Sequence, residues 1–270
     1  MKHIDFSVLC SLYFKEQPEF LDDCLKSIFD QSLQASEIVV VHDGPLTDAL
    51  YAVLEKWRKL LPIKDVVLEQ NVGLGEALNK GLSHCSYDLV VRVDTDDINL
   101  KSRFHDQITF MNDNPGVAVS SSYIEEFDKT PSESGKLRRV PTANILAHSV
   151  RLNPINHMAS VFRKHKIIAS GGYKHLMYME DYYLWLRVLA SGEEIANLDK
   201  VLVKARTGNG MLERRRGTTY AKSEIKLMKH IFKLGLSKSP LTFAYFLSRS
   251  ISRLMPAGFL RVVYRFLRTS

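Results

Sequence analysis

Three carboxylates lie within four positions directly after an apolar run, and this arrangement suits a metal ion. Residues 89–93 have the length and composition of a buried strand, and Asp94, Asp96 and Asp97 follow them. Carboxylates this close repel one another unless a cation lies between them. Oxygen ligands suit Mg²⁺ or Mn²⁺, and a metal with open coordination positions can take phosphate oxygens. The cluster therefore predicts a metal–diphosphate site, with an acidic turn that caps the next helix as the alternative.

Two further loops with polar or glycine residues follow apolar runs earlier in the chain. Asp43, in the sequence His-Asp-Gly-Pro, can accept hydrogen bonds from a base N–H or from sugar hydroxyls, or can cap a turn. Gly73 and Gly75 open a helix where backbone N–H groups can approach a phosphate, although their spacing matches neither a Walker loop nor a dinucleotide fingerprint. Ligands bind at the carboxyl ends of strands in open α/β sheets, so we expect these loops beside Asp94.

A candidate general base lies further along the chain. Glu180 and Asp181 open a strongly apolar helix, where a carboxylate can act as a base or can simply favour the helix dipole. His157 is a lone histidine, which is more often structural than catalytic. The chain has no serine or cysteine in a nucleophile-elbow sequence and no His-Glu-x-x-His sequence, which argues against a hydrolase with a covalent serine or a catalytic zinc.

The elements that must position these residues alternate between strand and helix. Apolar strands are predicted at residues 4–12, 37–42, 66–68 and 89–93, and helical faces at 18–29, 46–61 and 73–85. This alternation predicts an α/β fold, with a mostly parallel sheet and helices on both faces. The later pattern predicts helices at 104–111, 141–152 and 180–190 and strands at 117–127, 157–162 and 194–205.

Length and composition fit one large domain, or one domain with an appendage, in 270 residues. The three cysteines lie in apolar runs, which favours buried thiols in a reducing compartment. No apolar stretch reaches the ~20 residues of a membrane span, and the N-terminus lacks the apolar core of a signal peptide. We therefore expect a cytoplasmic protein that does not cross a membrane.

The positive charge of the chain is concentrated in its last sixty residues. Residues 211–270 hold thirteen lysines and arginines against two acids, whereas the preceding residues are net acidic. Residues 241–247 and 259–267 are rich in aromatic and aliphatic side chains interleaved with arginines. Such segments suit the plane of an anionic membrane surface, so we predict a membrane-associated tail. The alternative is a helical pair that packs on the core with a solvated basic face.

Taken in order, these motifs resemble those of the family 2 glycosyltransferases, which have the GT-A fold, a Rossmann-like sheet. The resemblance covers roughly residues 4–205 and is closest to the bacterial subgroup that builds O-antigen and exopolysaccharide repeat units, including the amylovoran-type transferases. The Gln-x-x-Arg-Trp motif of processive members is missing, which favours transfer of a single sugar. The matching motifs are Ser-Val-Leu-Cys-Ser-Leu-Tyr at 7–13, Leu-Lys-Ser-Ile-Phe-Asp-Gln-Ser at 25–32, His-Asp-Gly-Pro at 42–45, Asn-Val-Gly-Leu-Gly-Glu-Ala-Leu-Asn-Lys-Gly at 71–81, Arg-Val-Asp-Thr-Asp-Asp at 92–97, Asn-His-Met at 156–158 and Glu-Asp-Tyr-Tyr-Leu-Trp at 180–185.

The resemblance implies a role for each motif residue. Asp181 is implied as the base, with Glu180 beside it, and Asp96 and Asp97 as the ligands of Mn²⁺ or Mg²⁺. Three arginines at 214–216 are possible diphosphate contacts. It also implies a GT-A domain at residues 1–210, with a nucleotide-sugar half at 1–115 and an acceptor half at 116–210, followed by a basic amphipathic helical tail at 211–270. The residues implied in nucleotide-sugar binding are Tyr13, Asp43, Asn71, Gly73, Lys80, Arg92, Asp94 and Asp96, and those on the acceptor side are His157 and Trp185.

The implied function is inverting, metal-dependent transfer of one hexose from a UDP-sugar, with UDP-glucose or UDP-galactose favoured. The implied acceptor is a sugar on a polyprenyl diphosphate, reached at the inner face of the cytoplasmic membrane. A nucleotidyltransferase is the alternative, but the glycine-rich loop usual after its first strand is replaced here by residues 13–18, which contain no glycine. A non-catalytic membrane-binding or nucleic-acid-binding protein is a weaker alternative. No nucleic-acid partner is expected, because the first 210 residues are net acidic.

Overall fold

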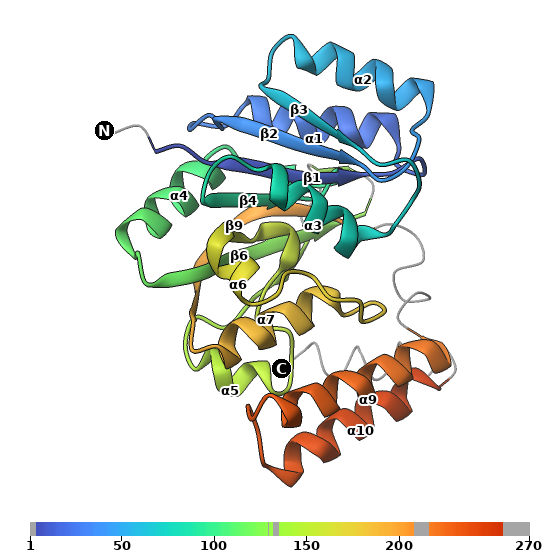
Figure 1. Ribbon diagram of the computed structural model, residues 1–270, viewed down its shortest axis with the longest axis vertical. Helices are drawn as coiled ribbons and strands as arrows, with labels where there is room; N and C mark the ends of the chain where they lie inside the picture. The colour runs from blue at the N-terminus through green and yellow to red at the C-terminus, as the bar shows by residue number, and fades with distance from the viewer. Residues whose placement is uncertain (1–3, 129, 132–134, 208–215, 256–270) are drawn as a thin grey trace.

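One sheet with helices on both faces forms the body of the molecule (Figure 1). The structure is a computed structural model that describes residues 4–128, 130–131, 135–207 and 216–255. The strands in these residues are β1 (Ser7–Leu12), β2 (Glu37–His42), β3 (Ile63–Val67), β4 (Leu89–Val93), β5 (Ile98–Asn99), β6 (Val117–Phe127), β7 (Lys136–Arg138), β8 (Val161–Arg163) and β9 (Glu194–Arg206). Their order is β3-β2-β1-β4-β8-β6-β9-β5, and β7 pairs with β6.

The first half of the chain builds the parallel part of the sheet. Strands β3, β2, β1 and β4 are all parallel and are connected through α1 (Pro18–Phe29), α2 (Asp48–Arg58) and α3 (Leu74–His84). Cys10 of β1 is level with both Val40 of β2 and Val93 of β4, so these strands end at one edge of the sheet. The predicted α/β alternation is confirmed, although β3 begins three residues before the predicted strand.

The second half of the sheet is mixed. Strand β8 is antiparallel to both β4 and β6, β6 is parallel to β9, and β5 is antiparallel to β9. The helices of this half are α4 (Arg103–Asp113), α5 (Ile145–Ser149), the 3-10 turn η1 (His157–Ala159), α6 (Lys164–Ala169) and α7 (Glu180–Ala190). The antiparallel β8 lies beside β4, so η1 and the start of α7 can approach the loop that follows β4.

Two predictions for this half were wrong. The helix predicted at 141–152 is only α5, because the chain enters it through Asn144 in a left-handed conformation with φ 51°. The strand predicted at 157–162 begins at Val161, because residues 157–159 turn as η1. Asn156 holds that turn against β6 by donating to the carbonyl oxygen of Ser122 at 2.9 Å. The short elements β5, β7 and α6 were not predicted.

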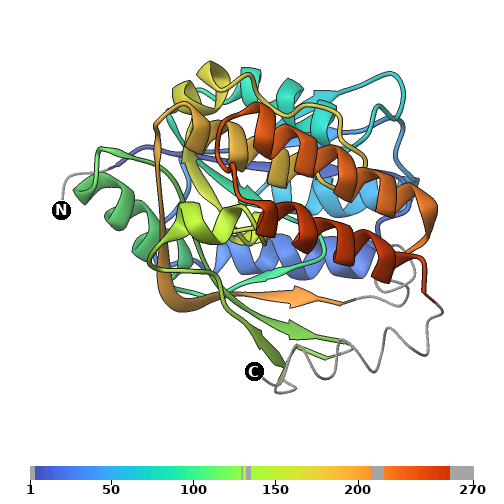
Figure 2. The same cartoon turned by 90° about the horizontal axis from the view of Figure 1, so that it is seen from below.

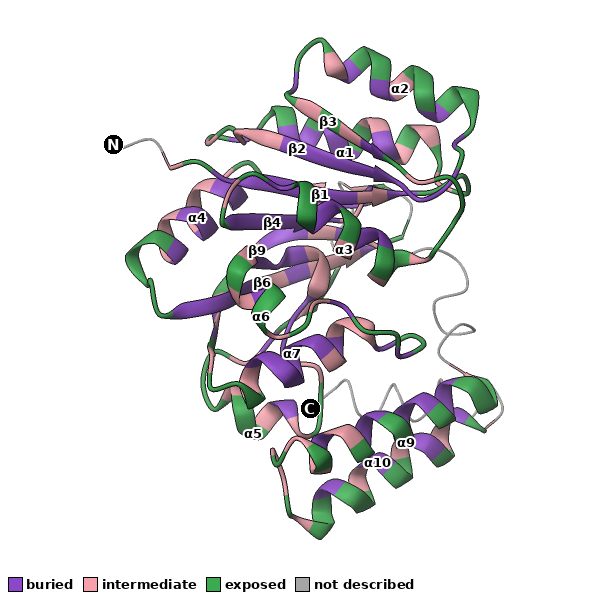
Figure 3. Cartoon of the chain, in the orientation of Figure 1, coloured by how far each residue is buried: buried purple, intermediate pink, exposed green. Residues whose placement is uncertain are grey.

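Alternation along the buried strands explains why both faces carry helices. Successive side chains of a strand point to opposite faces, so an apolar run has two faces to cover. Val8 and Cys10 pack on the face covered by α1, α2 and α4, and Leu9 packs on the face covered by α3 and α7. Figure 3 shows the buried strands between these two layers.

Two C-terminal helices, α9 (Gly217–Lys233) and α10 (Pro240–Arg253), lie side by side against the α7 side of the body (Figure 2). Tyr220 and Leu227 of α9 and Phe246 of α10 share a core cluster with Leu186 of α7. Glu224 is fully buried between the two helices and accepts hydrogen bonds from Arg249 at 2.7 Å and Arg253 at 3.1 Å.

The predicted tail is therefore, over residues 217–253, a helical pair packed on the body, and two of its arginines are ion-paired. Helix α9 lies within the helical tail expected at 211–270, although no separate helix was assigned to its residues, and the segment predicted at 259–267 lies outside the described residues. Across those described, no helix is both long and apolar enough to span a membrane.

Gly81 of α3 gives a test of the packing beneath the site. A Cβ atom at Gly81 would lie 2.4 Å from Leu9 Cδ1 and 2.5 Å from Val41 Cγ2, so α3 would have to move away from the sheet. We expect Gly81→Ala to lower the free energy of unfolding by about 1–3 kcal/mol, as overpacking does. Chemical denaturation would measure it, with Gly116→Ala as control because its Cβ would meet only Glu194 Oε2 at 3.7 Å. Equal losses in the two variants would contradict the expectation.

Candidate active site

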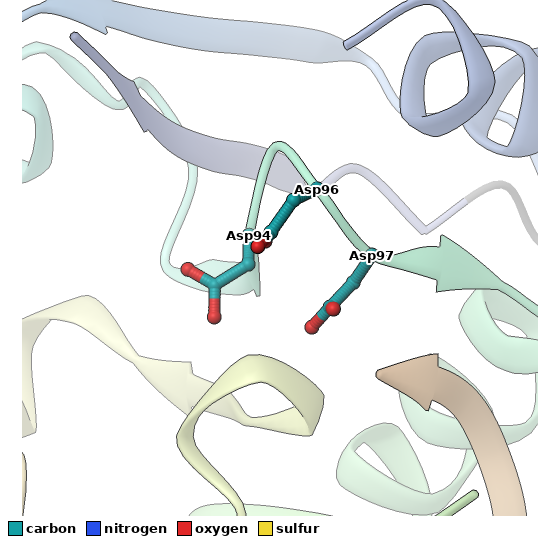
Figure 4. Close-up of side chains that lie close together, drawn as sticks. All are labelled: Asp94, Asp96 and Asp97. Carbon is teal, nitrogen blue, oxygen red and sulfur yellow. The ribbon is translucent and has the colours of Figure 1, made fainter. Parts of the chain in front are cut away.

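The three aspartates that follow β4 converge at the edge of the sheet (Figure 4). One oxygen from each of Asp94, Asp96 and Asp97 lies within 4.8 Å of the others. Asp97 is buried, and its Oδ1 accepts a hydrogen bond from the backbone N–H of Arg206 at 2.8 Å. Its Oδ2 is also buried and has no hydrogen-bond partner in the described part of the chain. We call Asp94, Asp96 and Asp97 the acidic triad.

Burial and the repulsion between neighbouring carboxylates disfavour the charged forms of Asp96 and Asp97. Burial and the negative charge of Asp94 raise the pKa of Asp96 to about 7. Burial, with the charges of Asp94 and Asp96, raises the pKa of Asp97 well above its ordinary value. A divalent cation would offset this repulsion, and the unpartnered Oδ2 of Asp97 is a free oxygen ligand for it. The donor set therefore fits Mn²⁺ or Mg²⁺.

A buried arginine supports the triad from the sheet. Arg92 is almost fully buried in β4 and forms an ion pair with Asp94. Burial lowers the pKa of Arg92, but the charge of Asp94 and its hydrogen bond outweigh burial and raise it overall. Its Nε and Nη1 atoms have no hydrogen-bond partner among the described residues. Arg92 therefore keeps donors available beside Asp94.

A cavity of about 660 Å³ opens beside Asp94, within the size range of small-ligand sites. Its walls come from the start of α3, the end of β4, η1 and the start of α7. Six predicted site residues meet in it, namely Gly73, Arg92, Asp94, His157, Glu180 and Asp181. Tyr13, Asp43, Asn71, Lys80, Asp96, Asp97 and Trp185 are not among the residues that line it.

The start of α7 places two carboxylates in the cavity wall. Asp181 Oδ2 accepts a hydrogen bond from Asn153 Nδ2 at 2.9 Å, and burial raises the pKa of Asp181 above its ordinary value. Burial also raises the pKa of Glu180. The start of α3 lies beside this wall, since a Cβ at Gly75 would lie 3.5 Å from Glu180 Cγ, an ordinary van der Waals distance. A carboxylate with a raised pKa is a stronger base, and this suits proton abstraction.

His157 also lines the cavity and is held neutral. Its Nε2 lies 2.8 Å from the hydroxyl oxygen of Tyr173, and burial, with the charge of Arg92, holds the pKa of His157 well below its ordinary value. Trp185 is fully buried in the core, with its ring 5.9 Å from the His157 ring between centroids. Trp185 therefore lies behind His157, away from the cavity surface where we had expected it.

Asp43 holds the loop of residues 71–73 before α3, which we call the glycine loop. Its two oxygens accept hydrogen bonds from the backbone N–H groups of Val72 at 2.6 Å and Gly73 at 3.1 Å, and from Asn71 Nδ2 at 3.0 Å. These bonds fix Gly73 in a conformation with φ 90°, which favours glycine. Asp43 and Asn71 thus shape the cavity wall from behind.

Other predicted residues lie apart from the cavity. Tyr13 is exposed after β1, and Lys80 is exposed on α3, where its Nζ lies 3.8 Å from a carboxylate oxygen of Glu76. Arg216 donates to the carbonyl oxygen of Met255 at 3.1 Å, and residues 214 and 215 lie outside the described residues.

Sequence reasoning missed several residues of the site. Tyr173 is fixed by Asn79, which donates to its carbonyl oxygen and accepts from its backbone N–H, each at 2.8 Å. The glycine pair before Tyr173 was a signal of this close approach. Arg206 ends β9 beside the triad and packs its guanidinium 3.9 Å from the centroid of the Phe20 ring. His175, Met177 and Tyr178 also line the cavity.

Metal binding by the triad should depend on pH. Because the pKa of Asp96 is raised to about 7, the folded protein favours the protonated form of this side chain. Its contribution to the free energy of unfolding is therefore fully present below the unfolded pKa of about 4 and is lost as the pH rises through about 7. Bound Mn²⁺ replaces the protons, so we expect it to raise the melting temperature more at pH 8 than at pH 6. Thermal unfolding with and without Mn²⁺ measures this. Asp97→Asn should lose most of the shift, and Asp113→Asn, at an exposed site, should keep it. A shift independent of pH would contradict the expectation.

Comparisons with known proteins agree with this geometry. The family model described as Glycosyl transferase family 2 matches residues 7–172. The chain is 47% identical over 263 residues to the amylovoran biosynthesis glycosyltransferase AmsE of Erwinia amylovora, covering 96% of this chain and 97% of that protein.

A second relative and a solved structure extend the match. The UDP-Gal:alpha-D-GlcNAc-diphosphoundecaprenol beta-1,3-galactosyltransferase of Escherichia coli is 40% identical over 261 residues, covering 96% of this chain and 95% of that protein. The crystal structure of S. aureus TarS 1-349 in complex with UDP-GlcNAc superposes with a TM-score of 0.71 and 22% identity, covering 95% of this chain and 75% of that one. The fold is therefore that of the GT-A glycosyltransferases, and the chain belongs to glycosyl transferase family 2 as a glycosyltransferase.

Proposed function

We propose that this enzyme transfers one hexose from a UDP-sugar to a sugar on a polyprenyl diphosphate, with inversion at the anomeric carbon. The observation that carries the proposal is a single cavity lined both by Asp94 of the acidic triad and by Asp181 at the start of α7. A donor held at the triad would place its anomeric carbon between the two. The relative from Escherichia coli supports the substrate classes, because its name gives UDP-Gal as donor and GlcNAc-diphosphoundecaprenol as acceptor.

The metal is part of the proposal. Enzymes with the GT-A fold commonly use divalent metals. Asp96 and Asp97 would hold Mn²⁺ or Mg²⁺, and the bound ion neutralises the charge of the diphosphate leaving group. Arg92 and Asp94 would contact the hydroxyls of the donor sugar, and the exposed ring of Tyr13 would stack on uracil. Asp43 and Asn71 act by shaping the glycine loop.

Asp181 is the proposed general base. Its carboxylate takes the proton of the acceptor hydroxyl while the hydroxyl oxygen attacks the anomeric carbon from the face opposite the diphosphate. The new glycosidic bond forms as the bond to the diphosphate breaks, so one displacement inverts an α-linked donor into a β-linked product. The raised pKa of Asp181 strengthens the base, and Asn153 orients it through the hydrogen bond to Oδ2.

Replacing the base gives a direct test. Asp181→Asn keeps the shape of the side chain and can still accept from Asn153, but it cannot take a proton. We expect turnover to fall by about 10²–10⁴-fold while Mn²⁺-dependent UDP binding stays unchanged. The measurement is UDP release from a panel of UDP-sugars with Mn²⁺ or EDTA, using a GlcNAc-diphosphate-lipid acceptor.

Asp48→Asn, at an exposed position in the first turn of α2, is the matched control and should retain full activity. Substantial turnover by Asp181→Asn would remove Asp181 as the base. Release of pyrophosphate in place of UDP would identify a nucleotidyltransferase instead.

We also propose that α10 docks the enzyme on the cytoplasmic face of the membrane that carries the lipid acceptor. The residues that α10 buries are Thr242, Phe246, Ser250 and Arg253, so its inner face is largely polar. Its outer face is apolar, with Phe243, Leu247, Ile251 and Leu254 exposed at helical spacing. We call these four residues the outer stripe. An apolar stripe of this kind suits the boundary between lipid headgroups and acyl chains.

The exposed positive charge of the two C-terminal helices comes mainly from lysines. Arg249 and Arg253 are ion-paired with Glu224, so they add little free charge. Four exposed lysines lie on α9, and Lys238 lies just before α10. Exposed lysines near an anionic surface contribute about 1 kcal/mol each, which favours anionic lipid as the partner of the stripe.

Replacing two residues of the outer stripe with serine should weaken the binding of the enzyme to lipid. We expect the double variant Phe243→Ser, Ile251→Ser to weaken binding to phosphatidylglycerol-containing vesicles at least about tenfold. The reason is that each large apolar side chain that moves from water into lipid contributes about 1.5–3 kcal/mol to binding. Vesicle sedimentation measures it, and activity on a short-chain soluble acceptor should be unchanged. Leu60→Ser is the control, since Leu60 is similarly exposed just after α2, a helix that lies at the other end of the body from α10 (Figure 1). Unchanged vesicle binding by the double variant would rule out α10 as the docking face.

A further inference from the structure

An exposed aromatic ring lies at the rim of the cavity, just before the proposed base. Tyr178 is 48% exposed, lines the cavity, and precedes Glu180 and Asp181 by two and three residues. Its neighbour Met177 is also exposed and lines the cavity. Large apolar side chains that remain in water beside polar groups are typical of ligand-binding walls.

The backbone at Tyr178 is strained. Its φ is 67°, in the left-handed region that a tyrosine rarely adopts. The strain arises in a turn in which the backbone N–H of Met179 donates to the carbonyl oxygen of Leu176 at 2.7 Å. Leu176 and Met179 are buried in the cluster shared with α9 and α10, so the turn pushes the two residues between them outward. A glycine would suit this position of the turn better, so the fold retains the ring against a conformational cost.

The C-terminal helices hold the ring in place. Tyr178 stacks on Tyr220 of α9, with centroids 5.4 Å apart and planes 19° apart. Tyr220 is in turn covered by Arg253 of α10, whose guanidinium carbon lies 4.6 Å from the centroid of its ring. Arg253 is anchored by the buried Glu224. The helical pair thus extends to the rim of the cavity and fixes the orientation of one side chain there.

We propose that Tyr178 is the platform for the acceptor sugar, whose ring packs its C–H face on the aromatic ring and presents a hydroxyl to Asp181. This inference rests on the proposed function and assigns its acceptor subsite. A pyranose has an apolar face edged with hydroxyls, which matches an aromatic ring beside carboxylates. The acceptor must approach from the side opposite the metal and diphosphate, and Tyr178 lines the cavity just before α7 and its proposed base, whereas the triad follows β4.

Four substitutions separate this role from a structural one. Tyr178→Ala should raise the KM for the acceptor about tenfold or more, with Mn²⁺-dependent UDP binding unchanged, and Tyr178→Phe should behave as wild type. Tyr178→Gly removes the ring but suits the left-handed backbone, so its melting temperature should not fall while its acceptor KM rises as for alanine. Tyr220→Leu should raise the acceptor KM by a smaller factor, because Tyr220 only positions the ring.

The control is Tyr51→Ala, another partly exposed tyrosine, on α2 and outside the cavity lining. An unchanged acceptor KM in Tyr178→Ala and Tyr178→Gly would overturn the proposal. The proposal would also fail if these variants weakened UDP binding as much as they raised the acceptor KM, because the ring would then lie at the donor. If the wild-type enzyme releases no UDP with any acceptor, the proposed function itself fails. If the wild-type enzyme is active and the Tyr178 variants are equally active, only the role of Tyr178 fails.

Discussion

Electrostatic repulsion within the acidic triad is the constraint on which the rest of the site depends. Three aspartates converge within 4.8 Å at a partly buried strand end, where burial by itself disfavours the charge of Asp96 and Asp97. The fold offsets this with Arg92 beside Asp94 and with the backbone N–H of Arg206 on Asp97. One layer deeper, the fully buried Arg103 donates to the carbonyl oxygen of Arg92 at 2.7 Å. These groups come from three different elements, β4, β9 and α4, so the site is stable only in the assembled fold.

The mixed order of the sheet brings the two halves of the cavity together. The parallel strands bring Asp43, the glycine loop and the triad to one edge, as in other open α/β sheets. The antiparallel β8 then lies against β4, and through it the chain delivers η1 and His157 to the same place. Asn79 of α3 is hydrogen-bonded to the backbone of Tyr173, so the helix that follows the glycine loop also fixes the segment before α7. The cavity therefore lies between the first and second halves of the chain, and both halves contribute residues to its lining.

The C-terminal helices have two faces with different roles. Their inner face is joined to the body by apolar packing and by the buried Glu224 cluster, and it reaches the cavity rim through Tyr220. If α9 and α10 slid along each other, the buried charge of Glu224 would lose its arginine partners, which is energetically costly. The Glu224 cluster therefore favours one register of the two helices. The outer face of α10 is apolar and exposed. A change of lipid contact at the outer face would therefore act on the same helices that orient Tyr178.

The sequence by itself determined the parallel strands, the first three helices and the triad, because continuous apolar runs and dense carboxylates are local patterns. It also identified Asp181 and His157 as candidates, which the structure brings together in one cavity. Only the tertiary structure decided that Trp185 lies in the core behind His157, that Asp43 shapes the glycine loop, and that Arg249 and Arg253 are paired with Glu224. It alone revealed Tyr173, Tyr178 and Arg206 at the site. These outcomes depend on contacts between residues 110 or more positions apart in some cases, such as Arg206 with Asp96, and no local periodicity encodes such contacts.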